Sequence, residues 1–368
     1  MNELSLKSDP LTGFIQVVGI GGIGTGTIIA LRGNHTLGRN ESRMGEVIEA
    51  RDYCKLHIAE HYIATLMGSK NAPEKFSVVA VGNVGNDAAG AALIREMGDA
   101  GIDTRHVRIE PDSRTMFSFA LLYPDKSGGN ITVSNSAACK LSSDQLSKCR
   151  DELAAVGSKG VALCLPEVPL EPRAEFLRIA TGCGSYRIAS FTSDEMAMAR
   201  KLGLLGNVDM LALNREEAIA FAGAPGDTGS ETGLLDKCCK VAAATHPTMR
   251  ILVSAGADGA YVLENGTWSH HDTVPVEPVS TAGAGDALLA GAISGLAAGL
   301  PLRGSKPAAK GGTKTIDSAI DLGLALAAFS VTSTHTIHPA ATLATLLSFA
   351  REHGIDSGKL EISIRRAK

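Results

Sequence analysis

The sequence predicts an α/β fold with a mainly parallel sheet covered by helices on both faces. Short apolar, β-branched segments alternate with helical or turn sequence, as in a chain that passes repeatedly through a buried parallel sheet. The chain has 368 residues, 44% hydrophobic and 20% charged, enough for one large α/β domain or two smaller ones. No Pro/Ser-rich linker divides it, so we expect a single domain over residues 1–368.

The first strand is expected at 14–19, an apolar run that ends in glycine. Residues 19–24 (GIGGIG) match GxGxxG, which raises the alternative of an NAD-dependent dehydrogenase. That motif requires a helix directly after it, whereas 25–31 resembles a second strand. We therefore disfavour the dehydrogenase.

The rest of the first half predicts a surface segment, a helix, two strands around a second helix, and a hairpin. Residues 32–52 are polar and glycine-punctuated, and we interpret them as a surface excursion. A helical pattern with Lys55 and His57 near its start follows at 53–67. Strands are expected at 77–82 and 106–109 around an alanine-rich helix, and a hairpin at 115–123 and 130–134.

The second half settles into repeated strand and helix units. A hairpin at 261–269, a polar insertion at 301–314 and an apolar helix at 317–333 complete it. The expected parallel strands are 161–165, 187–191, 210–213 and 251–254.

The stretch 280–286 (STAGAGD) is a glycine-rich turn that opens directly into an apolar helix. Glycines let the backbone N–H groups turn toward one point, and the positive end of the helix adds to them, so the turn suits an anion. Asp286 next to such a turn has two interpretations. It is either the base that deprotonates a hydroxyl attacking a phosphoryl group, or an Asp that caps the helix.

Composition excludes several classes of partner. The net charge is −4 and no long basic run occurs, which argues against nucleic-acid binding. The N-terminus lacks a signal-peptide pattern and no run of about eighteen apolar residues occurs, so we expect a cytoplasmic protein without a membrane contact. The seven cysteines lack CxxC spacing, so we expect them to be reduced and not to bind zinc.

Four sequence blocks follow one another along the chain: 82–90 (GNVGNDAAG), 214–217 (NREE), 254–259 (SAGADG) and 281–286 (TAGAGD). Together they make the chain resemble the ribokinase-like (PfkB) carbohydrate kinases over roughly residues 14 to 350. The resemblance implies ATP-dependent phosphorylation of a hydroxyl on a small sugar-like molecule, on a Rossmann-like sheet with a small β lid. We expect the lid to come from about 20–52 and 113–135, inserted in the α/β core.

The resemblance assigns roles to the residues of the last block. Asp286 becomes the general base, and the backbone of Ala282, Gly283, Ala284 and Gly285 becomes the anion hole for the transferring phosphoryl group. Thr281 and Ala282 would also border the nucleotide.

Asn214 and Glu217 match the family's NxxE motif, which organises Mg²⁺, water and phosphate, with Glu217 closest to the metal. The same spacing is also an ordinary capping box, in which each side chain bonds the other residue's backbone N–H.

The turn of Ser254, Gly256, Asp258 and Gly259 would lie beside ATP. The nucleobase would approach the later apolar helix at Ala327, Ala328 and Val331, for which a core helix is the alternative interpretation. Ser280 and Ser330 to His338 match the region where some relatives hold a monovalent cation such as K⁺, and the sequence leaves that open. Ser280 stands where relatives commonly carry Asp.

The departures from the family lie on the substrate side. Relatives carry Asn and Asp in a GGxNxD strand, where this chain has Gly24 and Gly26. They also carry GGKGAN at a helix start, where this chain has 54–59 (CKLHIA). We therefore hypothesise that Lys55 and His57, together with Arg43, bind a negatively charged substrate.

Two alternatives to a sugar kinase stay open. One is a nucleoside kinase, and the other is a nucleotide- or metabolite-binding protein of the same fold with reduced catalysis. In each case the partner is a small molecule, and a lid strand with an apolar face would allow a homodimer.

Overall fold

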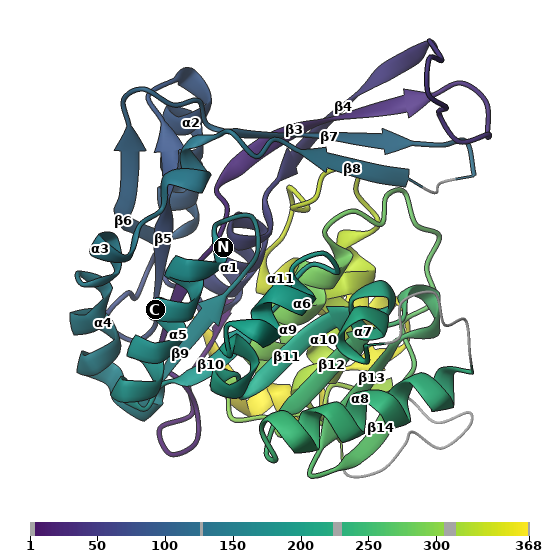
Figure 1. The fold of residues 1–368 in the computed structure, drawn as a ribbon. Helices are drawn as coiled ribbons and strands as arrows, with labels where there is room; N and C mark the ends of the chain where they lie inside the picture. The colour runs from purple at the N-terminus through teal and green to yellow at the C-terminus, as the bar shows by residue number, and fades with distance from the viewer. Residues whose placement is uncertain (1–3, 126–127, 224–229, 305–313, 367–368) are drawn as a thin grey trace.

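The computed structural model describes residues 4–125, 128–223, 230–304 and 314–366. Within this part of the chain, a nine-stranded sheet and a separate four-stranded sheet account for most strands (Figure 1). Two small pairs complete them. The strand β1 (Leu4–Leu6) pairs with β17 (Ile364–Arg366), and β15 (Lys314–Thr315) pairs with β16 (Ile355–Asp356).

The large sheet is parallel over seven strands and becomes antiparallel at one edge, where the hairpin β13–β14 joins β12. The central strands are buried segments, as the apolar runs predict, whereas the two edge strands are mostly half-buried or exposed. In spatial order the strands are β14 (Thr267–His271), β13 (Ala260–Glu264), β12 (Arg250–Ser254), β11 (Met210–Asn214), β10 (Tyr186–Ala189), β9 (Gly160–Cys164), β2 (Gln16–Ile20), β5 (Ser77–Gly85) and β6 (Ile102–Glu110).

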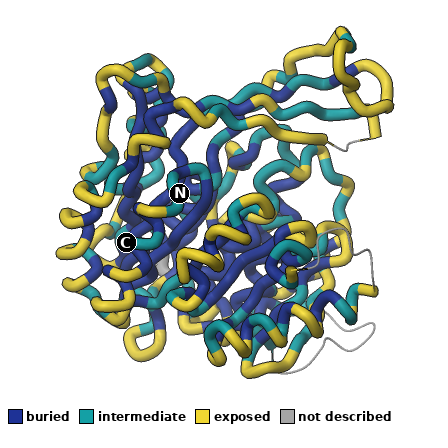
Figure 2. Tube along the Cα trace, viewed as in Figure 1, coloured by how far each residue is buried: buried dark blue, intermediate teal, exposed yellow. Residues whose placement is uncertain are grey.

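Helices cover both faces of this sheet, because successive strand residues point to opposite sides. Val17 belongs to one apolar cluster and Val18 to the other, and Figure 2 shows the buried strands between the two helix layers. One layer holds α1 (Lys55–Met67), α2 (Ala88–Ala100), α9 (Ala284–Ala297), α10 (Ala319–Ser330) and α11 (Leu343–Glu352). The other holds α3 (Ser143–Leu146), α4 (Cys149–Val156), α5 (Leu170–Cys183), α6 (Met196–Lys201), α7 (Arg215–Phe221) and α8 (Glu231–Thr245).

The four-stranded sheet forms a layer of its own at the top of Figure 1. Its order is β4 (Gly45–Tyr53), β3 (Gly24–Leu31), β7 (Met116–Leu122) and β8 (Gly128–Thr132). The fold class predicted from the sequence is therefore confirmed: a mainly parallel sheet with helices on both faces and a small additional sheet.

Two local predictions need correction or completion. Residues 32–52 are not only a surface excursion, since they contain most of β4; this strand is largely exposed, so it lacks the apolar alternation that would have revealed it. The predicted insertion at 301–314 lies largely outside the described residues. After the GxGxxG match, Gly24 begins strand β3 and not a helix.

Among the described residues, no helix is both long and apolar enough to cross a membrane. The cysteines of the described chain are all free, with no disulfide among them.

Candidate active site

The turn before α9 has the geometry expected of an anion site. Gly283 precedes the helix with φ of 78°, in the left-handed region that glycine adopts without strain. A Cβ at this position would lie 2.8 Å from the carbonyl oxygen of Thr336, so the turn also packs closely against the 335–338 segment. Among the described residues no side chain caps the first turn of α9, although the Ala284 N–H donates to the Thr281 carbonyl oxygen at 3.3 Å. The turn and the helix start still point N–H groups toward one side, as an anion site requires.

Asp286 lies inside the first turn of α9, three residues after the capping Gly283, and makes no capping hydrogen bond. The interpretation of Asp286 as a helix cap is therefore wrong. Its side chain is 14% exposed, and Lys55 Nζ lies 3.8 Å from its Oδ1. Burial raises the pKa of Asp286, the Lys55 ammonium lowers it, and the Asp52 carboxylate raises it further.

Lys55 is surrounded by acidic side chains. Asp286 raises the pKa of Lys55 most, and Glu217 and Glu167 raise it further. Glu167 Oε2 also accepts a hydrogen bond of 3.2 Å from the backbone N–H of Lys55. The lysine therefore joins the start of α1 to carboxylates from three other elements.

Glu167 was not anticipated from the sequence. It follows β9 directly, and the carboxyl ends of parallel strands are where ligands bind in such sheets, which is the signal that could have revealed it. Its backbone has φ of 75°, an uncommon conformation for a residue with a side chain. Burial raises the pKa of the Glu167 carboxyl to about 7, partly opposed by Lys55.

Asn214 and Glu217 form a capping box at the start of α7. Asn214 Oδ1 accepts from the N–H of Glu217 at 2.8 Å, and Glu217 Oε2 accepts from the N–H of Asn214 at 2.8 Å. Glu217 is 7% exposed, and burial raises its pKa while Lys55 lowers it. Glu217 therefore has the predicted capping role and also lies near enough to Lys55 to interact with its charge.

A pocket of about 500 Å³ joins the NREE segment to the SAGADG turn, with Asn214, Ser254, Gly256 and Asp258 in its wall. The two segments meet because Asn214 and Ser254 are paired residues of β11 and β12. A Cβ on Gly285 would lie 4.0 Å from Ser254 Oγ, so the anion turn lies next to this pocket. Three of the predicted blocks are thus adjacent in space.

The other residues predicted to border the nucleotide differ in how deeply they are buried. Gly259 has φ of 87°, and a Cβ there would lie 2.0 Å from the carbonyl oxygen of His271, so the turn requires glycine. Thr281 is exposed at the start of the anion turn, and Ala282 N–H donates to Ser280 Oγ at 3.3 Å. Ala328 is 3% exposed within the core, as the alternative interpretation of a core helix expects.

The three basic residues of the charged-substrate hypothesis do not converge on one site in this structure. Arg43 forms an ion pair with Glu41 at 2.6 Å, away from Lys55. His57 is 1% exposed, with ring centroids 4.5 Å from Tyr53 and 5.8 Å from His61.

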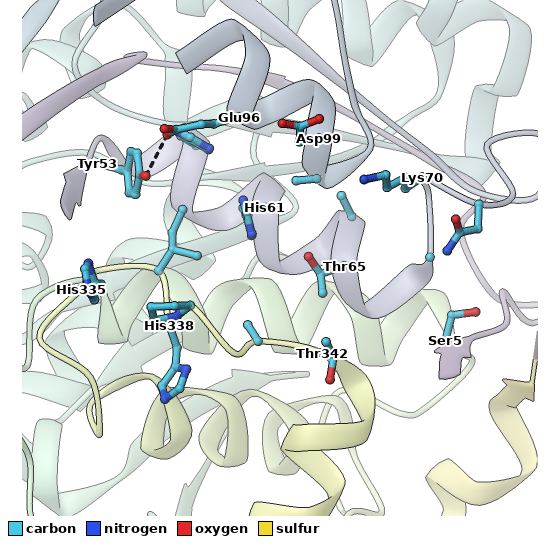
Figure 3. Close-up of a pocket in the computed structure, with 18 of the residues that line it drawn as sticks. Ser5, Tyr53, His61, Thr65, Lys70, Glu96, Asp99, His335, His338 and Thr342 are labelled. Atoms are coloured by element: carbon cyan, nitrogen blue, oxygen red, sulfur yellow. Dashed lines mark hydrogen bonds between the residues drawn. The ribbon is translucent and has the colours of Figure 1, made fainter. Parts of the chain in front are cut away.

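His57 borders a different cavity from Lys55. This cavity of about 1050 Å³ lies between α1, α2 and the 335–342 segment, and Asp286 does not line it. Figure 3 shows it, with the hydrogen bond from Tyr53 to Glu96 at one end and Lys70 at the other. Because residues two apart on a helix point in different directions, a helix start that offers Lys55 to Asp286 turns His57 away.

Gly24 and Gly26 lie on β3, beside the junction of β4 and α1. Gly24 accepts a hydrogen bond of 3.2 Å from the N–H of Cys54 through its carbonyl oxygen. Gly26 pairs with Asp52 of β4, a buried acid that the sequence did not single out.

Within the described residues, no group of three or more His, Cys, Asp or Glu side chains could hold a metal ion by itself. A single carboxylate such as Glu217 fits Mg²⁺ in a kinase, because this ion keeps several waters and binds mainly to substrate phosphates.

Comparisons with known proteins identify the family to which the chain belongs. The chain matches the pfkB family carbohydrate kinases over residues 63–343. It is 25% identical over 231 residues to "Probable fructokinase-7" of Arabidopsis thaliana, covering 60% of this chain and 65% of that protein. The match thus spans slightly less than two thirds of the curated relative.

Solved structures share the fold. Ribokinase from Giardia lamblia has a TM-score of 0.74 at 14% identity, covering 91% of this chain and 99% of that one. Ribokinase from Cryptococcus neoformans var. grubii serotype A, solved in complex with ADP, has a TM-score of 0.69 at 17% identity, covering 91% and 99%.

The residues around Asp286 therefore lie on a fold that is shared with solved ribokinases. By its match over most of its length, the chain belongs to the pfkB family of carbohydrate kinases.

Proposed function

We propose that this protein transfers the γ-phosphoryl group of ATP to a hydroxyl of a neutral sugar. The observation that carries the proposal is the position of Asp286, in the first turn of α9 beside an uncapped glycine turn and 3.8 Å from Lys55. A base, an anion site and a cation thus lie within one small region, as in-line transfer requires.

In the proposed mechanism, Asp286 accepts the proton of the attacking hydroxyl. Burial raises the pKa of this carboxyl, which makes it a stronger base than an ordinary Asp. The backbone N–H groups at 282–285 stabilise the charge that develops on the phosphoryl oxygens. Lys55 stabilises the Asp286 carboxylate and lies where it can approach the transferring group.

The nucleotide would lie along the pocket of Asn214, Ser254, Gly256 and Asp258. Glu217 would hold Mg²⁺ through its carboxylate, with Asn214 supporting it, and the ion supplies charge neutralisation on the ATP phosphates when bound.

The acceptor is proposed to be neutral because the charges near Asp286 are mainly negative. Glu167, Glu217 and Asp286 all act on Lys55, and Asp52 acts on Asp286. The site therefore has one ammonium group, on Lys55, and four carboxyl groups, which disfavours binding of an anionic acceptor. Carboxylates do accept hydrogen bonds from the hydroxyl groups of a neutral sugar.

A substrate panel with ATP and Mg²⁺, read by mass spectrometry of the product, tests the proposal. D-fructose and D-ribose are the first acceptors, since relatives are named fructokinase and ribokinase. We expect a product 80 Da heavier than the sugar, from addition of HPO₃ (~80 Da). Phosphorylation of nucleosides alone would favour a nucleoside kinase. Stabilisation by ATP without any product would favour the binding protein.

A further inference from the structure

Strand β3 borders the proposed acceptor side. At one of its glycines, a side chain from β4 and a side chain from β7 meet. Gly26 of β3 is paired with Asp52 of β4 on one side and with Ser118 of β7 on the other. Side chains at paired positions of neighbouring strands lie on the same face of a sheet. Ser118 Oγ donates a hydrogen bond of 2.7 Å to Asp52 Oδ2 on this face.

These two side chains occupy the space that a side chain at position 26 would need. An ideal Cβ on Gly26 would lie 2.3 Å from Asp52 Oδ2 and 2.2 Å from Ser118 Oγ. A carboxylate therefore lies at the place of the missing side chain, but it is attached to the neighbouring strand.

Close contacts of the same kind occur at the first residue of β3 and in the segment before it. A Cβ on Gly24 would lie 2.8 Å from Cys54 Sγ, and one on Gly22, which precedes β3, would lie 2.5 Å from Glu167 Cβ. Three glycines between 22 and 26 are thus each faced by a larger residue, from β4, from the start of α1 or from the segment after β9. The larger residues at 54–59 and the glycines at 24 and 26 are separate departures from the family in the sequence. In the structure, Cys54 from the first segment lies against Gly24 from the second.

Asp52 lies close enough to the proposed catalytic base to influence it. Its carboxylate raises the pKa of Asp286 and of Cys54. Asp52 is 7% exposed, and the interactions that shift its own pKa include Ser118 and the Tyr53 N–H but no basic side chain. A carboxylate has about four acceptor positions, so this one can still accept from a ligand hydroxyl.

We infer that Asp52, held by Ser118, is the residue that recognises a hydroxyl of the acceptor, and that it replaces a side chain on β3. The inference rests on the proposed function and specifies its acceptor. The acceptor is a neutral polyhydroxylated molecule that donates a hydroxyl to Asp52 while another hydroxyl faces Asp286.

The first test compares Asp52→Asn and Ser118→Ala with wild type. Glu46→Gln is the matched control, because Glu46 is an exposed acid on the same strand that forms an ion pair with Arg32. For Asp52→Asn we expect the acceptor KM to rise about 10- to 100-fold, the range of a charge-assisted hydrogen bond, with the ATP KM unchanged. Ser118→Ala should raise the acceptor KM about 3- to 10-fold, and Glu46→Gln should leave it unchanged.

A second test separates recognition from structural support. Monodeoxy analogues of the sugar lack one hydroxyl each, and one of them should lose affinity for wild type but not for Asp52→Asn. Calorimetric binding of D-fructose and D-ribose in the presence of ADP gives the same comparison without turnover.

The outcomes distinguish this inference from the proposed function. If wild type phosphorylates a sugar and Asp52→Asn keeps its acceptor KM, Asp52 is not the recognition residue and the proposed function stands. If wild type binds a sugar through Asp52 but forms no product, the proposed function fails and the inference stands. A wild type that binds no neutral sugar overturns the inference as well.

Discussion

On the proposed nucleotide side of Asp286 the site consists of backbone turns, whereas on the proposed acceptor side it consists of side chains from separate elements. The nucleotide side uses the glycine turn before α9, the SAGADG turn after β12 and the capping box of α7. The acceptor side brings together Asp52 from β4, Lys55 from α1 and Glu167 after β9.

This difference indicates which side can change without loss of the chemistry. A turn that presents N–H groups depends on glycine at positions such as Gly283 and Gly259, where a Cβ would collide with another carbonyl. A hydroxyl-binding carboxylate can come from any strand that reaches the same point. We therefore expect that substitutions on the proposed acceptor side change which acceptor is bound, while the capacity for phosphoryl transfer is retained.

The largest expected effect is at the residue that the two sides share. Asp286→Asn keeps the shape of the side chain but removes the base, so kcat should fall about 10³-fold or more. The affinity for ATP, measured by calorimetry, should remain within about twofold. Near-normal turnover by the Asn variant would remove Asp286 as the base.

Lys55→Met tests the connection between the two sides. Lys55 lowers the pKa of Asp286, so its removal should raise that pKa and move the acid limb of the kcat/KM profile to higher pH. We expect kcat/KM at pH 8 to fall about 10- to 100-fold. A profile that keeps its acid limb in place would contradict the role given to Lys55.

Asn214→Ala tests the nucleotide side alone. Both the capping of α7 and the support of Glu217 are lost, so the ATP KM should rise about 5- to 10-fold. Thr342→Ala is the control, because Thr342 forms the same type of capping box at α11. Each variant should lose about 1 kcal/mol of stability, measured by urea unfolding, but only Asn214→Ala should change the ATP KM. If the two variants had equal KM values for ATP, the role of Asn214 would be limited to capping α7.

The smallest effect is a change in stability on the acceptor side. The pKa of Glu167 is raised to about 7, so between about 4.5 and 7 the folded protein keeps a proton that the unfolded chain releases. Folding stability from this group therefore falls as pH rises through that window. Glu167→Gln cannot ionise, so its Tm should exceed that of wild type at pH 8 by more than at pH 5. An equal Tm difference at both pH values would show that Glu167 does not titrate in this range.

The strand pattern predicted much of the fold, because buried strands are apolar and follow each other at regular spacing. The strand expected at 14–19 is β2, and those expected at 210–213 and 251–254 are β11 and β12. The strand β4 was missed, since most of its residues are exposed. Strands without a buried face leave little signal in a sequence.

The sequence by itself determined the blocks on the nucleotide side, including Asn214, Ser254 and Asp286. Each depends on a glycine turn or a helix start, which are encoded by adjacent residues. Only the tertiary structure showed that Asp52 and Ser118 meet at Gly26, that Glu167 joins Lys55, and that His57 faces another cavity. These contacts arise from strand pairing and helix orientation between residues far apart in the chain, and no local pattern specifies them.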